Sequence, residues 1–242
     1  MKNNDSDDEG NNSGSDVEVD IKKYPLKITM VGNASVGKTS IIKRYFENKF
    51  ELNSTETTIS AFYHCKNLKI DPFTEAELQI WDTAGQEKYR SLTKNYLINA
   101  NGILIVFDLG DEKSFNDLDL WMEEINNVID EKKVTIILVG NKSDLPDQKI
   151  NNDNALAYAD KHNIKYLSVS AKDGVNIDYL FEIIGSDCIK KIQEEEQKNN
   201  ENENIAKKDN RDSNLSGQFE NNLNLENNKN NEQTDQKTKK CC

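Results

Sequence analysis

The chain has 242 residues, of which 43 are acidic and 31 are lysine or arginine, so its formal net charge at pH 7 is −12. This acidic balance argues against nucleic acid as the main partner, because phosphate backbones attract basic surfaces. No apolar run approaches the ~20 residues that a membrane-spanning helix needs, and the N-terminus lacks the apolar centre of a signal peptide. Four cysteines without metal-ligand spacing are typical of a reducing compartment, and we expect synthesis in the cytosol.

Polarity divides the chain into a core and two tails. Residues 1–20 carry seven acidic side chains against one lysine, and 13 of the last 52 residues are asparagine. Neither segment has enough apolar surface to offset the entropy lost on ordering. We therefore expect a disordered acidic extension over 1–20 and a disordered tail over 191–242. Residues 21–190 hold nearly all the aliphatic runs and have the size of one domain.

Strand and helix patterns alternate along this core. The first apolar run, 26–31, predicts a strand, and a helical pattern follows at 41–46. A polar loop then precedes a hairpin with strands at 59–70 and 77–81. The later patterns predict strands at 103–109, 134–139 and 164–169, and helices at 114–129, capped by Ser114, at 155–161 and at 177–192. Six strands and five flanking helices, four of which are placed above, predict an α/β fold, with a mostly parallel sheet, one antiparallel edge strand and helices on both faces.

The stretch GNASVGKTS lies between the first predicted strand and helix, and it has the form G-x-x-x-x-G-K-[ST]. Its glycines let the backbone turn so that N–H groups face a phosphate at the start of the helix. We expect the lysine to contact the terminal phosphates and the following threonine to ligate Mg²⁺. The predicted nucleotide-binding residues here are Gly32, Asn33, Ala34, Ser35, Val36, Gly37, Lys38, Thr39 and Ser40.

Further polar motifs follow predicted strands, at the sheet edge where ligands bind in such folds. In DTAGQE, Asp82 is expected to hold Mg²⁺, the N–H of Gly85 to approach a terminal phosphate, and Gln86 to lie near an attacking water. In NKSD, Asp144 offers two acceptor oxygens that suit the N1–H and amine of guanine, which adenine lacks. The other predicted base contacts are Asn141, Lys142, Ser170, Ala171 and Lys172.

The motifs GNASVGKTS, WDTAGQEKYRSL, NKSD and SAK, in this order and spacing, resemble the small GTPases of the Ras superfamily over about residues 25–190. The second motif, the Thr58-Ile59 pair and the terminal Cys241-Cys242 resemble the Rab branch most, and the context 57–61 is similar to that of endocytic Rabs. The resemblance implies a P-loop GTPase fold and hydrolysis of GTP to GDP with Mg²⁺. It also implies two segments ordered by the γ-phosphate, 47–60 and 84–97.

For individual residues, the resemblance implies Gln86 as the catalytic residue and Phe50 as the aromatic side chain at the guanine edge. The segment from Phe50 onward is one residue longer than usual, so the magnesium threonine is Thr57 by counting forward and Thr58 by counting back from Ile59. We favour Thr58, because an apolar Ile59 anchors the following strand and a loop absorbs an extra residue easily. The triad of aromatic residues facing effectors would comprise Trp81, Tyr96 and either Phe62 or Tyr63.

A Rab-like switch implies partners and a place in the cell. The partners are an exchange factor, a GTPase-activating protein, a dissociation inhibitor, a prenylation escort and effectors, and the chain itself is expected to be a monomer. Prenylation of Cys241 and Cys242 would hold it on the cytosolic face of an intracellular membrane, vesicle or endosome, from which it cycles with the cytosol. A nucleotide-locked binding module is disfavoured by Gln86, and an ATP-specific enzyme by Asp144.

Overall fold

The computed structural model describes residues 20–51, 62–83 and 90–201. These residues fall into two compact units that divide after Ile189, and residues 190–201 of the second unit are helical. The first unit contains the sheet. The disorder predicted from residue 191 is wrong for 191–201, because the C-terminal helix continues through these residues. The predicted extension, apart from residue 20, and the tail beyond residue 201 lie outside the described residues, so their disorder stays a prediction.

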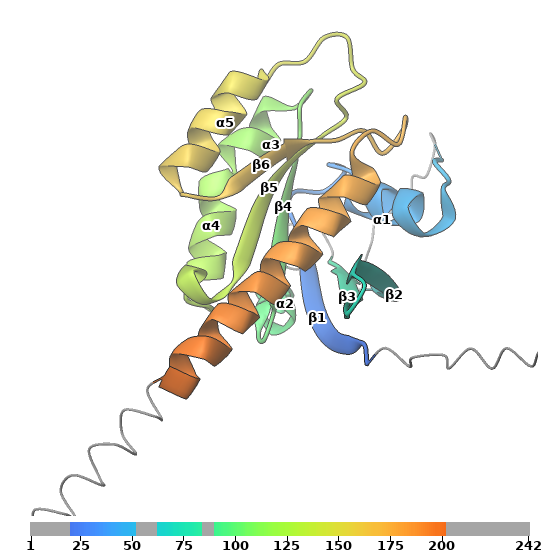
Figure 1. Cartoon of the computed structure of the whole chain (residues 1–242). Helices are drawn as coiled ribbons and strands as arrows, with labels where there is room; N and C mark the ends of the chain where they lie inside the picture. Colours follow the sequence, from blue (N-terminus) through green and yellow to red (C-terminus); the bar gives the residue numbers. More distant parts are fainter. Residues whose placement is uncertain (1–19, 52–61, 84–89, 202–242) are drawn as a thin grey trace, which may run out of the picture. The chain divides into compact units, whose positions relative to one another are not determined.

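Six strands form one sheet in the order β2-β3-β1-β4-β5-β6 (Figure 1). All neighbouring strands run parallel except β2 and β3, which form an antiparallel hairpin at the edge. The predicted mostly parallel sheet with one antiparallel edge strand is confirmed. The strands are β1 Lys22–Val31, β2 Phe62–Asp71, β3 Thr74–Asp82, β4 Gly102–Asp108, β5 Thr135–Asn141 and β6 Lys165–Ser168.

Strand β1 begins at Lys22, earlier than the apolar run predicted. The polar residues at its start pair with the first half of β3, from Lys22 opposite Thr74 to Pro25 opposite Glu77. Backbone pairing therefore extends the strand beyond the run that marks it in the sequence. Strand β4 shows the reverse relation, because every residue from 102 to 108 is buried and its apolar run marks it fully.

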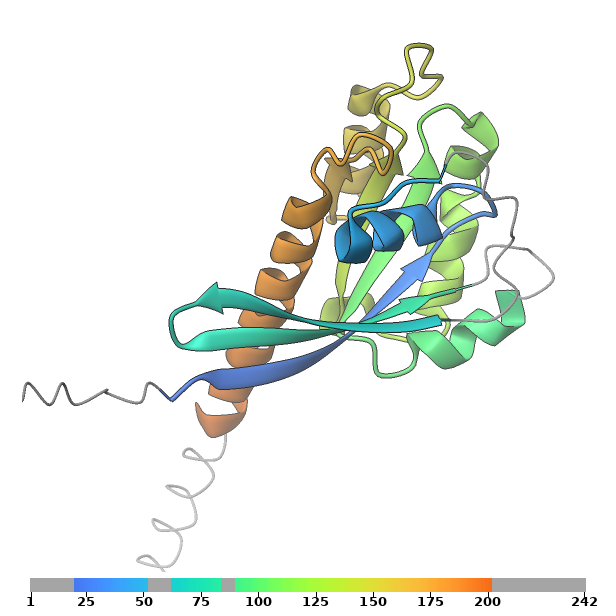
Figure 2. The same cartoon turned by 90° about the vertical axis from the view of Figure 1, so that its right-hand side faces the viewer.

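Helices cover both faces of the sheet (Figure 2). On one face, Leu97, Trp121 and Ala155 from three different helices share a core with β4 and β5. On the other face the ring of Tyr45 stacks on that of Phe181, with 4.0 Å between their centroids. The helices are α1 Lys38–Glu47, α2 Arg90–Leu97, α3 Glu112–Asn116, α4 Leu118–Asn126 and α5 Asn152–Lys161, followed by an unlabelled helix, the C-terminal helix, of which residues 177–189 belong to this unit.

The predicted helix over 114–129 is wrong at its start and in its continuity. Asp111, not Ser114, is the N-cap, and its carboxylate accepts the backbone N–H of Lys113 at 3.1 Å. The hydroxyl of Ser114 is buried and accepts the backbone N–H of Asp108 at 3.0 Å. Aspartate and serine are both good caps, so the sequence pattern did not separate them. The segment forms two helices, α3 and α4, in place of one.

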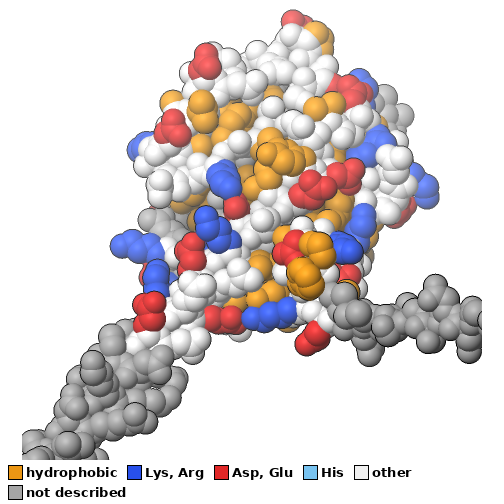
Figure 3. Space-filling view, viewed as in Figure 1, with side chains coloured by type: hydrophobic (Ala, Val, Ile, Leu, Met, Phe, Trp, Pro, Cys, Tyr) orange, Lys and Arg blue, Asp and Glu red, His pale blue; other side chains and the backbone are white. Residues whose placement is uncertain are grey.

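The surface of this unit mixes charged and apolar side chains. On the face seen in Figure 1, lysine and arginine side chains are interspersed with acidic ones and with apolar patches (Figure 3). Such mixing is typical of a solvated surface. Within the described residues, every helix is either too short or too polar to cross a bilayer.

Candidate functional site

The loop between β1 and α1 is held against the carboxyl ends of the neighbouring strands. Gly32 has φ 140°, and a Cβ built on it would lie 2.1 Å from the carbonyl oxygen of Val106 in β4. Gly37, with φ 99°, would place a Cβ 2.2 Å from the side-chain nitrogen of Asn141. Both positions therefore need glycine for two reasons, the backbone angle and the close approach. Gly37 caps α1, so the first N–H groups of that helix open at the loop, as an anion site requires.

Lys38 lies beneath this loop and is only 6% exposed. Its ammonium donates to the carbonyl oxygens of Gly32 and Asn33, each at 2.8 Å. Burial lowers the pKa of Lys38 to about 8, and the negative charge of Asp82 opposes that shift. The structure thus brings the predicted lysine to the inside of the loop, with a fixed direction.

The side chain of Asn33 ties the loop to α4. Its amide nitrogen donates to the carboxylate of Asp117 at 2.7 Å, and its amide oxygen accepts the indole N–H of Trp121 at 2.9 Å. Ser35, two residues on, adopts φ 64°, a left-handed conformation that costs a non-glycine residue about 1 kcal/mol. The loop therefore keeps its shape through side-chain anchors as well as through its glycines.

Thr39 and Asp82 meet at the point where a metal is predicted. The hydroxyl of Thr39 donates to one carboxylate oxygen of Asp82 at 2.6 Å. The other oxygen, Oδ1, is buried and has no hydrogen-bond partner among the residues that the structure describes. Burial raises the pKa of Asp82, and the hydrogen bond from Thr39 and the charge of Lys38 act against that rise. A hydroxyl beside an unpartnered carboxylate oxygen is a donor set that fits Mg²⁺.

No cluster of three or more acidic, histidine or cysteine side chains suited to a metal exists among the described residues. A magnesium site here would therefore combine the hydroxyl and the single carboxylate with oxygens from a ligand, as is usual for Mg²⁺ bound with phosphates. Thr57 and Thr58, the two candidates for the second threonine, lie outside the described residues.

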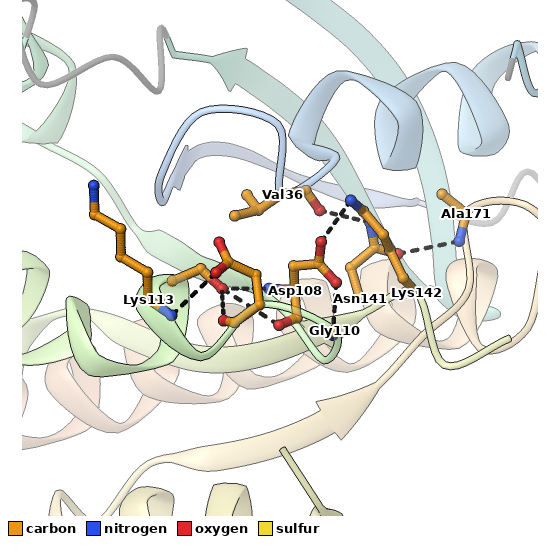
Figure 4. Close-up of polar contacts among 9 residues, drawn as sticks. Val36, Asp108, Gly110, Lys113, Asn141, Lys142 and Ala171 are labelled. Carbon is orange, nitrogen blue, oxygen red and sulfur yellow. Dashed lines mark hydrogen bonds and ion pairs between the residues drawn. The ribbon is translucent and has the colours of Figure 1, made fainter. Parts of the chain in front are cut away.

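Asn141 connects two loops. One is the loop between β1 and α1, residues 32–37, which we call the phosphate loop, and the other is the loop that follows β6. Its side chain is 1% exposed, and its nitrogen donates to the carbonyl oxygen of Val36 at 2.8 Å. Its oxygen accepts the backbone N–H of Ala171 at 3.2 Å (Figure 4). We call residues 170–175 the base loop. The amide of Asn141 thus spans from one predicted ligand-binding loop to the other.

Asp144 lies beside the base loop and is held by two of its side chains. Ser170 donates its hydroxyl to one carboxylate oxygen at 2.7 Å, and the ammonium of Lys172 lies 3.4 Å from the other. Burial acts to raise the pKa of Asp144, but the hydrogen bonds and the lysine charge outweigh it and lower that pKa below its ordinary value. The carboxylate is therefore ionised at neutral pH and fixed in direction, as an acceptor for two donors of a base must be.

Sequence reasoning missed the partner of Lys142. The Lys142 ammonium lies 2.6 Å from one carboxylate oxygen of Asp108, whose other oxygen accepts the backbone N–H of Gly110 at 2.8 Å (Figure 4). Lys142 itself has φ 65°, so its backbone is held in a left-handed turn. Asp108 is a charged residue that closes the apolar strand β4. That position at a strand exit was the signal that could have identified it.

The aromatic side chains near β3 resolve one open alternative. Tyr63 pairs with Trp81 across the hairpin, with 5.3 Å between ring centroids, and Tyr96 lies 5.5 Å from the same indole. Tyr63 therefore joins Trp81 and Tyr96 in one aromatic cluster, which favours Tyr63 over Phe62 as the third residue of the predicted triad, and the role of these rings toward effectors stays a prediction. Phe50 is half-buried just after α1. The remaining predicted residues Gly85, Gln86, Cys241 and Cys242 lie outside the described residues.

Comparison with known proteins gives consistent matches. The model of the Ras family matches residues 27–190. The Ras-related protein RabG2 of Dictyostelium discoideum is 41% identical over 157 residues, which are 64% of this chain and 78% of that protein. The GTP-binding protein YPT1 of Saccharomyces cerevisiae is 35% identical over 81% of this chain and 92% of its own length. The Ras-related protein Rab11A of Lotus japonicus is 37% identical over 65% and 69% of the two chains.

Replacing Asp108 with asparagine is expected to lower the free energy of unfolding by about 1 kcal/mol, because Lys142 loses its partner in a mostly buried pair. Urea titration would measure this change. The matched control is Asp187→Asn, which breaks the more exposed pair with Lys165 and is expected to cost less than about 0.5 kcal/mol. Equal effects of the two substitutions would contradict a special role for Asp108.

Proposed function

Since this chain belongs to the Ras family, and within it to the Rab branch, we propose that it is a membrane-anchored switch that binds GTP and GDP with Mg²⁺ in vesicle traffic. Ras-family proteins of this kind hydrolyse GTP, and the chain is a small GTPase. We place it on the cytosolic face of a vesicle or endosome. The similarity of residues 57–61 to endocytic Rabs supports the endosome.

The observation that carries the choice of guanine is the fixed carboxylate of Asp144. Ser170 contacts one carboxylate oxygen and Lys172 contacts the other. Each oxygen keeps a further lone pair, and these can accept the N1–H and the exocyclic amine of guanine. An adenine ring would present an acceptor at N1 and no amine there, so the lone pairs of Asp144 that face the base would stay without donors. Asn141 keeps the N–H of Ala171 and the phosphate loop in one fixed relation, which supports a single ligand that reaches both.

We assign the nucleotide contacts as the sequence predicts them. The phosphates lie against residues 32–40, with the ammonium of Lys38 at the terminal phosphates and the N–H of Gly85 near the γ-phosphate. The stem of Lys142 covers the base, and Phe50 lies at its edge. The residues that read the base or support those that do are Asn141, Lys142, Asp144, Ser170, Ala171 and Lys172.

Thr39, Thr58 and Asp82 would hold Mg²⁺, which supplies positive charge against the phosphate oxygens when it is bound. The unpartnered oxygen of Asp82 supports this assignment. The contact between Tyr63 and Trp81 supports Thr58 over Thr57, because the register that puts Tyr63 in the triad also puts Thr58 at the metal. Gln86 would orient the attacking water, since positioning is most of what the protein contributes to this chemistry.

We further propose that Cys241 and Cys242 carry prenyl groups. A single lipid chain anchors a protein only marginally, whereas two hold it stably. The regulators would be an exchange factor, a GTPase-activating protein, a dissociation inhibitor and a prenylation escort, with effectors bound in the GTP state. We propose that the core over 21–190 acts as a monomer, flanked by the extension 1–20 and the tail 191–242, with disorder in the extension and in the tail beyond the helix that ends at residue 201.

The first test of base recognition is Asp144→Asn. The amide of asparagine donates where the carboxylate accepts, so affinity for GDP is expected to fall about 100-fold. Xanthosine diphosphate has an oxygen in place of the amine and is expected to gain affinity. Competition against fluorescent GDP measures both. Asp173→Asn removes the same charge from the base loop and should change neither affinity. Unaltered GDP binding by the Asp144 variant would refute the base assignment.

A second test separates the switch residues by single-turnover hydrolysis of bound GTP. Gln86→Leu is expected to slow the intrinsic rate about tenfold or more, because the water loses its positioning group. Thr58→Ala should slow it similarly through loss of a metal ligand, and Thr57→Ala should stay within about twofold of the parent. Slow hydrolysis by the Thr57 variant with normal hydrolysis by the Thr58 variant would move the metal ligand to Thr57.

A third test concerns the lipid anchor. Intact-mass measurement of the protein from its native cell should show two prenyl groups, and the double variant Cys241→Ser, Cys242→Ser should lose both the added mass and flotation with membranes. Cys65→Ser, which changes an exposed cysteine of β2, is the control and should leave both unchanged. Parent protein that floats with membranes but carries no added lipid mass would exclude this anchor.

A further inference from the structure

We propose that Arg44 is a positioning residue for guanine recognition: from α1, its guanidinium holds the backbone of the base loop in the conformation that binds the base. This inference rests on the proposed function and extends it to a residue that none of the motifs contains. It concerns the guanidinium group alone and assigns Arg44 no contact with the nucleotide.

Every nitrogen of the Arg44 guanidinium donates to a neighbouring oxygen. Nε donates to the carbonyl oxygen of Ala171 at 2.8 Å, and Nη2 to that of Lys172 at 2.5 Å. Nη1 donates to the carbonyl and side-chain oxygens of Asn48, both at 3.0 Å. In this planar group two different nitrogens, held in a fixed geometry, meet two consecutive carbonyl groups, whereas the ammonium of a lysine at this position would have to reach both from one freely rotating nitrogen. Figure 1 shows α1 beside the loop that leads into the C-terminal helix.

The two carbonyl groups that Arg44 holds belong to residues that also contact Asn141 and Asp144, two of the residues proposed to read the base. Ala171 turns its N–H toward the oxygen of Asn141, and Lys172 extends its ammonium toward Asp144. Holding the carbonyl oxygens of Ala171 and Lys172 from α1 restrains the two peptide units that begin at these residues, and so restrains the backbone from which the Ala171 N–H and the Lys172 side chain extend. Arg44 therefore acts on the base through the direction of these groups.

The same helix also carries the phosphate contacts. Lys38 begins α1, and Arg44 lies six positions on, about 9 Å along the axis at 1.5 Å per residue. Asn48 ends the helix in a left-handed conformation, φ 53°, and leads to Phe50. One rigid element thus sets the distance between the phosphate site and the base loop, and Arg44 is the link at the base end.

Three variants of the full chain test this role: Arg44→Met, which keeps the stem and removes every donor, Arg44→Lys, which keeps the charge, and Lys43→Met as the control. Lys43 is the neighbouring residue of α1 and pairs with Glu51 at the surface, 3.0 Å apart. Dissociation of ribose-labelled GDP and of ribose-labelled inosine diphosphate, which lacks the amine that Asp144 reads, is followed with Mg²⁺ present. Hydrolysis of bound GTP is measured in a single turnover.

Arg44→Met is expected to release GDP about tenfold faster than the parent, Arg44→Lys about threefold faster, and Lys43→Met at the parent rate. The ratio of inosine diphosphate to GDP dissociation rates should fall in Arg44→Met by about threefold, while hydrolysis of bound GTP stays within about twofold. An unchanged GDP rate would overturn the proposal. So would equal acceleration of both nucleotides, or parallel loss of hydrolysis, since either is what general loosening of α1 predicts.

Failure of this inference is distinguishable from failure of the proposed function. If the parent protein released GDP and inosine diphosphate at the same rate, the assignment of guanine to Asp144 would fail before any variant was compared. If the parent discriminates and Arg44→Met discriminates equally well, only the role of Arg44 is refuted.

Discussion

The amide of Asn141 is the constraint on which the rest of the site depends. It is buried, and it holds a carbonyl of the phosphate loop with its nitrogen and an N–H of the base loop with its oxygen. An unpaired buried amide costs about 1–3 kcal/mol for each group left without a partner, so both loops must stay in place for the amide to remain satisfied. In the proposed function, recognition of the phosphates and recognition of the base are therefore coupled, because a shift of either loop breaks hydrogen bonds of the same side chain.

The position of the Asn141 side chain also gives a second reason for glycine at position 37. In the sequence, Gly37 is expected because a phosphate loop needs unusual backbone angles, and it does adopt φ 99°. The structure adds that a Cβ there would meet the nitrogen of Asn141 at 2.2 Å. The second glycine of the pattern G-x-x-x-x-G-K-[ST] is therefore also required by a contact with a residue far along the chain, although the motif looks local. Gly32 does the same toward the carbonyl oxygen of Val106.

What the sequence predicted well depends on periodicity or on a local motif. The run 103–109 marked β4 because a strand buried on both faces is apolar throughout, and the alternation of strands and helices predicted the sheet. The start of β1 was missed because pairing with β3, and not apolarity, extends the strand. The cap at Asp111 was missed because aspartate and serine are equally good caps. Arg44 and Asp108 were missed for a related reason. Each binds groups of residues far away in the chain. The place of Asp108 at a strand exit is a signal, although it does not name the partner, and nothing next to Arg44 in the sequence signals its contacts.

The two ends of the site differ in how completely the protein satisfies its own polar groups. At the proposed base end, Asp144 has partners on both oxygens and Asn141 on both atoms of its amide, so the groups proposed to read guanine are fixed by the fold. At the phosphate end, Asp82 keeps a buried oxygen without a partner among the described residues, although its neighbour Thr39 satisfies the other. That oxygen costs about 1–3 kcal/mol, which a cation bound there would offset. In the proposed function, the base site is therefore formed by the folded chain itself, whereas the phosphate end gains stability when a cation reaches the buried oxygen of Asp82.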